Sequence, residues 1–390
     1  MDHSATEASV SLLAALDAVG RTASARSAEI EAGRRLPPDL VAALVATGVF
    51  RTWVPARYGG RECDLRTGLD AIELASYHDG STGWCVMIGV SSSLLAGRLS
   101  PDWAEQVFGD PGAILGGYAM PAGTARPVAG GLRVSGRWSW GSGTSHCTWI
   151  GGGARLVDAA GAPAPRADGL RAPFVLFDRA DVEVLDTWHV AGLKGTASND
   201  YVVRDAFVPE GRWGEFLGAA AVCDGPLYRF SFTGALALGT AAVGLGLARR
   251  AVDELVAIGG KIPSGSGRSL AERPTVQAEI ATAEATLRSA RAFLHEVVDD
   301  AWEASRRGER PAVEQRRLLR LAATHAMAQA ARAVDLCYTA GGGSSIWETS
   351  PLQRCFRDVH VATQHGMVAP RTLEPLGRLA FGLDTDTSQL

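Results

Sequence analysis

The pattern of hydrophobic and polar positions changes twice along the chain. Up to about residue 110, apolar residues recur at helical spacing; in 36–50, for example, Leu40, Leu44 and Val45 form one stripe that stops at Gly48. Between about 113 and 222, short runs rich in β-branched and aromatic residues are separated by Gly, Pro, Asp or Asn, which is typical of strands. Beyond 222 the helical spacing returns, with helices expected at 232–258, 275–306, 312–339 and 351–369.

This order predicts an α+β protein of three domains, because 390 residues are too many for one small core. We expect an N-terminal helical domain at 1–112 and a middle β-sandwich or barrel domain at 113–222. A C-terminal four-helix bundle is expected at 223–390.

Composition and charge exclude several classes of protein. The net charge of -4 gives no basic excess, so nucleic-acid binding is not expected. The six cysteines form no C-x-x-C pair, and the first residues lack a secretory pattern, so we expect a cytoplasmic protein. Residues 230–248 carry no charge, but their four glycines and several hydroxyl side chains favour a helix buried among other helices over a membrane span.

The common cofactor and metal motifs are absent from the sequence. GLGLAR at Gly244 lacks the third glycine of a dinucleotide fingerprint, and GKIPSGSG lacks the Lys-Ser/Thr pair of a phosphate loop. HEVVD at His295 lacks the second histidine of a zinc helix, so we interpret it as a solvated helix face and expect no metal. WGSGT around Ser142 lacks the spacing of a nucleophile elbow.

Four segments, taken in order, resemble the acyl-CoA dehydrogenase superfamily. RRLPPDLVAALVATGVFRTWVPARYGG resembles its N-terminal helices, and GRWSWGSGTSHCTWI resembles the flavin-facing strand of its β domain. WHVAGLKGTASNDYVVRDAFVP resembles the last part of that domain, and AGGGSSIWETSPLQRCFRDVH resembles the glycine-rich turn and Arg-Asp helix near the C-terminus. The resemblance implies the same fold, a flavin (FAD or FMN) and a homotetramer.

Candidate flavin contacts cluster in the second of these segments. An isoalloxazine needs an apolar, planar slot with a few polar groups at its heteroatoms. A ring, close backbone approach and hydroxyls are offered there by Trp140, Gly141, Ser142, Gly143 and Thr144. The resemblance further implies cofactor contacts, partly from a neighbouring subunit, by Arg268, Arg273, Gln277, Gly341 and Gly342.

The expected catalytic carboxylate of a dehydrogenase is missing. No Asp or Glu occurs between Val359 and Thr372, and none between Pro226 and Arg250, so neither family position for that base is filled. His365 stands there instead, and the resemblance shifts to the two-component flavin-dependent monooxygenases of the phenol hydroxylase type. It implies a histidine on this helix that faces the flavin. We expect His365 to be the substrate base, with a pKa near the ordinary 6.5, and Asp358, on the same helical face, to influence its orientation.

These observations predict an oxygenase component that hydroxylates a small aromatic or other electron-rich substrate with reduced flavin and O2. Ser142 is expected near flavin N5, and the candidate substrate contacts are Trp84, Ser92 and His189; Ser91 to Ser93 stand where relatives carry a histidine. Without a nicotinamide motif, reduced flavin should come from a separate reductase. Two alternatives stay open: a flavin-dependent dehydrogenase or desaturase with another base, and a non-catalytic member that keeps only the fold.

Overall fold

The N-terminal region of this computed structural model is helical. The structure describes residues 3–215 and 221–390, with side chains from residue 9 onward. Its first helices are α1 (His3–Ala25), α2 (Ser27–Gly33), α3 (Pro38–Thr47), α4 (Leu65–His78), α5 (Gly80–Ser93) and α6 (Pro101–Phe108), with short 3-10 turns η1 (Val49–Arg51), η2 (Ala56–Tyr58) and η3 (Leu94–Gly97). Helix α3 ends where the sequence predicts, because Gly48 takes a left-handed φ of 76° that closes the helix.

One seven-stranded sheet follows, in the order β5-β6-β2-β1-β3-β4-β7. Its strands are β1 (Leu115–Val128), β2 (Gly131–Gly141), β3 (Trp149–Leu156), β4 (Phe174–Asp178), β5 (Glu183–Val184), β6 (Asn199–Pro209) and β7 (Trp213–Gly214), with η4 (Arg179–Asp181) and η5 (Lys194–Thr196) between them. Most neighbours are antiparallel, but β1 and β3 run parallel. The predicted β region is therefore a single sheet with β5 and β7 at its edges.

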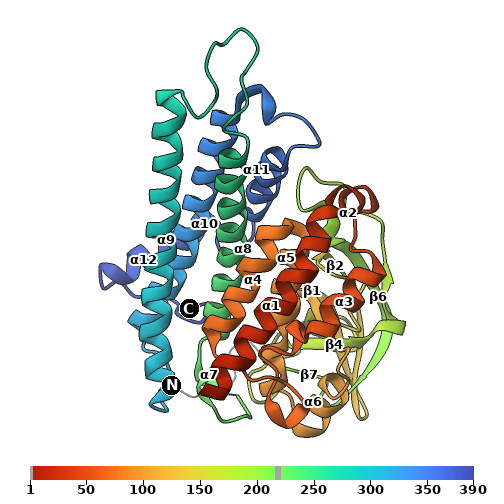
Figure 1. Cartoon of the computed structure of the whole chain (residues 1–390). Helices are drawn as coiled ribbons and strands as arrows, with labels where there is room; N and C mark the ends of the chain where they lie inside the picture. The colour runs from red at the N-terminus through yellow and green to blue at the C-terminus, as the bar shows by residue number, and fades with distance from the viewer. Residues whose placement is uncertain (1–2, 216–220) are drawn as a thin grey trace.

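The C-terminal region is a bundle of long helices, which Figure 1 shows beside the N-terminal helices, with the sheet on the far side. It contains α7 (Pro226–Arg229), α8 (Phe232–Ala257), α9 (Pro274–Arg306), α10 (Val313–Gly341), α11 (Pro351–Ala362) and α12 (Leu373–Ala380), with η6 (Gly342–Ser344) and η7 (Pro370–Thr372). Helix α10 packs on α8 and α9, and α11 packs on α8 and α10. The order of helices, sheet and helical bundle confirms the predicted architecture; the middle domain's predicted end at 222 falls just past residues 216–220, which lie outside the described part of the chain.

Helix α8 contains most of the uncharged stretch, whose length is close to that of a membrane-spanning helix. It is the one helix among the described residues that is long and apolar enough to cross a bilayer, yet 89% of its most apolar window is buried in the protein. The glycines of α8 allow this burial: a Cβ at Gly246 would lie 2.3 Å from the backbone oxygen of Glu73 on α4. Helix α8 is thus explained by packing within the fold.

Helix α5 lies where the three regions meet. It packs against α4 and α8, against β1 of the sheet, and against η5 and α11. Asp79 caps its N-terminus, since its side chain accepts hydrogen bonds from the backbone N–H and the hydroxyl of Thr82, both at 2.8 Å. Because α5 touches every region, its side chains can join groups that are far apart in the sequence.

Candidate active site

Three side chains from distant parts of the chain meet around α5. The indole N–H of Trp84 donates a hydrogen bond to Ser142 Oγ over 3.0 Å. The ring of Trp84 also meets the imidazole of His365 edge-on, with centroids 5.4 Å apart and planes at 77°. Trp84 and Ser142 are buried, and His365 is half-buried. Trp84 therefore connects the residue expected beside the flavin to the residue expected beside the substrate.

Ser142 is the end of a chain of hydroxyl groups. Its Oγ lies 2.7 Å from Ser198 Oγ, which lies 2.6 Å from Thr196 Oγ1. Thr196 donates its one proton to the backbone oxygen of Leu193, so Ser198 must donate to Thr196 and Ser142 to Ser198. With its proton used and one lone pair filled by Trp84, Ser142 Oγ keeps one acceptor site, which suits an N–H donor such as N5–H of a reduced flavin.

A bulge in β2 exposes an indole ring beside this serine. Between Trp138 and Gly141, three residue steps on β2 face only two on β6. Trp140 takes up the extra residue with a left-handed φ of 58°. Alternate strand residues normally share a face, but here Trp138 is buried and Trp140 is 60% exposed. An open aromatic surface next to a buried hydroxyl fits the needs of an isoalloxazine.

Helix α11 clamps the segment that carries the hydroxyl chain. Arg357 donates from Nη1 to the backbone oxygen of Ala191 over 2.6 Å, and Asp358 accepts from the backbone N–H of Leu193 over 2.6 Å. Between these contacts, a Cβ on Gly192 would lie 2.3 Å from the backbone of Arg357, so only glycine fits. Leu193 has a left-handed φ of 51°, a strained conformation that the clamp holds in place.

His365 lies in a turn and not on the expected helix, which ends at Ala362. Gly366 and Pro370 follow and both disfavour further helix. The expected help from Asp358 is also corrected, because its carboxylate binds the backbone of Leu193 instead.

The environment of His365 fixes its protonation. The backbone N–H of Met367 donates to His365 Nδ1 over 3.4 Å, so Nδ1 is an acceptor and the neutral ring carries its proton on Nε2. Burial, reinforced by the charges of Arg320 and Arg371, lowers the pKa of His365 to about 4. This corrects the expected pKa near 6.5: at neutral pH the ring is uncharged and can donate through Nε2.

One face of α5 continues from Trp84 along the interior. Ile88 and Ser92 follow it at intervals of four residues and therefore share its face. They are the half-buried residues of a helix whose other side chains are buried. Trp84, Ile88 and Ser92 thus form one stripe, of which Trp84 contacts His365 while Ile88 and Ser92 are partly exposed. The two residues expected to contact the substrate from this helix, Trp84 and Ser92, both lie on the stripe.

Other expected site residues lie outside this group. Thr144 is buried and donates to the backbone oxygen of Ala197 over 2.8 Å, so its hydroxyl holds the turn. His189 is exposed and lies 3.3 Å from Arg34 Nη1 on the outer surface. The remaining expected cofactor contacts lie at one end of the bundle. There Gly341, at the end of α10, faces Ile258, which begins the loop 259–273. These residues are Arg268, Arg273, Gln277, Gly341 and Gly342.

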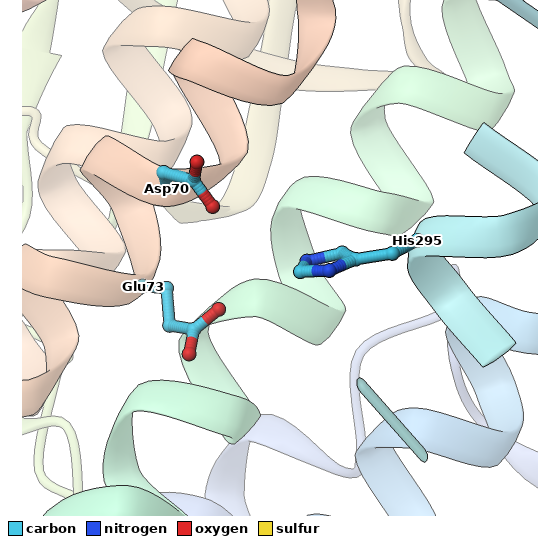
Figure 2. Close-up of side chains that lie close together, drawn as sticks. All are labelled: Asp70, Glu73 and His295. Carbon is cyan, nitrogen blue, oxygen red and sulfur yellow. The ribbon is translucent and has the colours of Figure 1, made fainter. Parts of the chain in front are cut away.

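A second group of ionisable side chains joins α4 to α9. Figure 2 shows Asp70 and Glu73 of α4 pointing toward His295 of α9, with their ligand atoms within 4.8 Å of one another. Arg291 lies 3.0 Å from Glu73 and 3.7 Å from Asp70, so a cation already pairs with both acids. Burial lowers the pKa of His295 to about 4, which corrects its interpretation as a solvated helix face. The group is explained as an ion-pair network between helices.

Known proteins resemble this chain in sequence and in fold. Residues 238–370 match the family model described as acyl-CoA dehydrogenase, C-terminal domain. The chain is 36% identical to the indole-3-acetate monooxygenase of Pseudomonas putida, over 92% of this chain and 90% of that protein. It belongs to the flavin-dependent monooxygenases of the acyl-CoA dehydrogenase superfamily. The monooxygenase is also 31% identical to the flavin-dependent monooxygenase oxygenase subunit HsaA of Rhodococcus jostii, over 95% and 99% of the two chains.

A solved structure agrees with the assignment. XiaF from Streptomyces, in complex with FADH2 and glycerol, matches the monooxygenase with a TM-score of 0.91 at 29% identity, over 98% of this chain and 97% of that one. The predicted fold, the flavin and the oxygenase activity are therefore confirmed. The dehydrogenase and non-catalytic alternatives are set aside.

Several residues of the candidate site were not found from the sequence. Thr196 and Ser198 stand in the quoted segment GTASN, whose density of hydroxyl groups was the available signal. Arg320 and Met367 gave no signal in the sequence, since the arginine is one of several in RRLLR and the methionine stands outside any motif.

Proposed function

We propose that the monooxygenase hydroxylates a small aromatic ring at the stripe of Trp84, Ile88 and Ser92. The proposal is supported by the contact of Trp84 with both Ser142 and His365. One indole ring thus touches the residue proposed to bind the flavin and the residue proposed to bind the substrate. The names of relatives point the same way, because one acts on indole-3-acetate. In the overall reaction one oxygen atom of O2 enters a ring C–H bond, the other leaves as water, and reduced flavin supplies the two electrons.

Each residue of the site has a distinct role in this proposal. Ser142 would accept a hydrogen bond from an N–H group of the reduced flavin, and Trp84 and Ser198 hold the Ser142 oxygen in position. His365, neutral and protonated on Nε2, donates a hydrogen bond to the polar group of the substrate. This donor role replaces the base expected from the sequence, because a pKa of about 4 makes His365 a weak proton acceptor.

A turnover assay tests the proposal. The protein is mixed with chemically reduced flavin, air-saturated buffer and indole-3-acetate, and product is measured by mass spectrometry. We expect a product 16 mass units heavier than the substrate, and only when flavin, O2 and protein are all present. Bleaching of bound flavin by an acyl-CoA without oxygenated product would instead support a dehydrogenase.

The source of reduced flavin is proposed to be a separate reductase in the cytoplasm. No nicotinamide fingerprint occurs in the sequence, and a relative is named as an oxygenase subunit. All six cysteines are free, and five of them are buried, which fits a reducing compartment.

The monooxygenase is further proposed to form a homotetramer. Large apolar side chains gather at the end of the bundle that carries Gly341 and the 259–273 loop, and four of them are more than 60% exposed: Val256, Ile262, Ile346 and Trp347. Exposed apolar groups of this kind mark interaction sites. A second copy placed here would also bring the loop of Arg268 to a neighbouring subunit.

Light scattering, which measures the mass of the assembly in solution, tests the proposed tetramer. We expect a mass about four times the 40.9 kDa of one chain. The double change Ile346→Asp with Trp347→Asp should shift the mass toward smaller species, because it charges the apolar surface. Phe381, which is 85% exposed outside this surface, offers a control: Phe381→Ser should leave the mass unchanged. A wild-type monomer at micromolar concentration contradicts the proposal.

A further inference from the structure

Arg320 on α10 is a buried cation without an acid. It is one of three arginines that are buried in the described part of the chain, with 5% of its surface exposed. The other two have acids in their electrostatic surroundings: Asp110 and Glu105 for Arg51, and Asp178 and Asp181 for Arg212. For Arg320 no such acid acts from the described residues, and burial alone lowers its pKa to about 10, so it stays charged at neutral pH. Burying a charge without a partner is costly, which makes the exception informative.

The guanidinium of Arg320 contacts the turn that carries His365. Its Nη1 donates to Met367 Sδ over 3.0 Å and its Nη2 to the Met367 backbone oxygen over 3.2 Å. The backbone N–H of the same Met367 contacts His365, so one residue separates the cation from the imidazole. A thioether is a weak acceptor on a flexible side chain, and it can give way to a stronger one.

The segments around the site supply further positive charge, and the two acids at their borders, Asp79 and Asp358, already accept hydrogen bonds from Thr82 and Leu193. No Asp or Glu occurs in 80–101 of α5 and its continuation, 113–150 of the sheet, 226–252 of α8, 315–334 of α10 or 359–373 around His365. The same segments contain Arg98, whose guanidinium lies 5.2 Å from the ring of Phe232, and Arg371, whose charge acts on His365. A neutral aromatic substrate would not pair with this excess of positive charge, whereas an anion would be attracted and held by it.

We propose that the substrate is an aromatic acid whose carboxylate pairs with Arg320 while its ring lies against Trp84 and His365. The carboxylate displaces the Met367 thioether and gives the buried guanidinium a charged acceptor. The inference rests on the proposed hydroxylation of an aromatic ring and narrows it to substrates with an acidic side chain.

The test compares one ring with and without the charge. Dissociation constants of indole-3-acetate and of its neutral isostere indole-3-acetamide are measured by calorimetry with wild type and Arg320→Met. A hydrogen bond to a charged group contributes roughly 1.5–3 kcal/mol, so the acid should bind wild type about 10- to 100-fold more tightly than the amide. Arg320→Met should abolish this preference by weakening the acid alone, and Arg320→Lys should restore part of it.

Control variants distinguish a carboxylate bound by Arg320 from one bound by another cation. Arg332 is exposed on the same helix, so Arg332→Met should keep the preference. If the wild-type protein binds the acid and the amide equally, the inference is wrong. This comparison uses only the wild-type protein, so it does not depend on whether a variant folds. A preference lost in Arg98→Met but kept in Arg320→Met also overturns it. If Arg320→Met weakens binding of reduced flavin and leaves the acid preference intact, the cation serves the flavin and the inference is wrong. Hydroxylation of either compound supports the proposed function separately, whichever of the two binds better.

Discussion

Replacing His365 with alanine is expected to lower hydroxylation about 10²- to 10³-fold, the usual effect of removing a positioned hydrogen-bond donor. Binding of reduced flavin should change little, because Ser142 and its partners Trp84 and Ser198 remain. The measurement is product formed per folded molecule, with flavin binding followed by fluorescence. His365→Gln keeps an N–H donor and should recover part of the rate, whereas a base would not be replaced by an amide.

The pH profile distinguishes the donor from a base in the same enzyme. Because burial lowers the pKa of His365 to about 4, the ring stays neutral from the neutral range down to about pH 5. Wild-type activity should therefore show no loss near pH 6.5 that depends on His365. A change that depends on this ring is expected only near pH 4, where protonation of Nδ1 breaks its hydrogen bond with the N–H of Met367. An acidic limb near 6.5 that disappears in His365→Ala would contradict the donor role.

Gly192→Ala is expected to destabilise the protein by about 3 kcal/mol and to uncouple oxygen use from hydroxylation. The new Cβ would lie 2.3 Å from the backbone of Arg357, which cannot rotate away as a side chain could. The segment that follows Gly192 must then move, and Ser198 would lose its 2.7 Å contact with Ser142. Thermal unfolding and hydrogen peroxide released per O2 consumed measure the two effects.

A matched glycine controls for the change of residue type. Gly377 on α12 has no heavy atom within 4 Å of an added Cβ, so Gly377→Ala should leave stability and coupling nearly unchanged. If Gly192→Ala unfolds at the wild-type temperature with wild-type coupling, the clamp formed by α11 does not hold the site.

The sequence carried enough information for the order of elements and for part of the site. Local signals such as Gly48 at the end of α3 fixed helix boundaries, and the aromatic and glycine residues around Ser142 pointed to the strand that we propose for the flavin. The end of α11 was placed too late because Thr363 and Gln364 give no strong stop signal before Gly366. His365 was therefore expected on a helix, when it lies in a turn.

The relations that complete the site are not local. Ser142 and Ser198 are 56 positions apart, and Arg320 and Met367 are 47 apart, so no spacing in the sequence predicts their contacts. The pKa of His365 likewise depends on burial and on Arg320 from another helix. The bulge that exposes Trp140 depends on the register with β6, which periodicity alone does not reveal.

Labelling with ¹⁸O2 tests the central claim most directly. The wild-type protein is mixed with reduced flavin, indole-3-acetate and ¹⁸O2, and the product is analysed by mass spectrometry. We predict one ¹⁸O atom in the ring of the product, and much less labelled product from His365→Ala because the substrate is held less well. Consumption of O2 that yields only hydrogen peroxide with every aromatic acid and amide tried, or an oxygenated product that carries oxygen from water, would contradict the account.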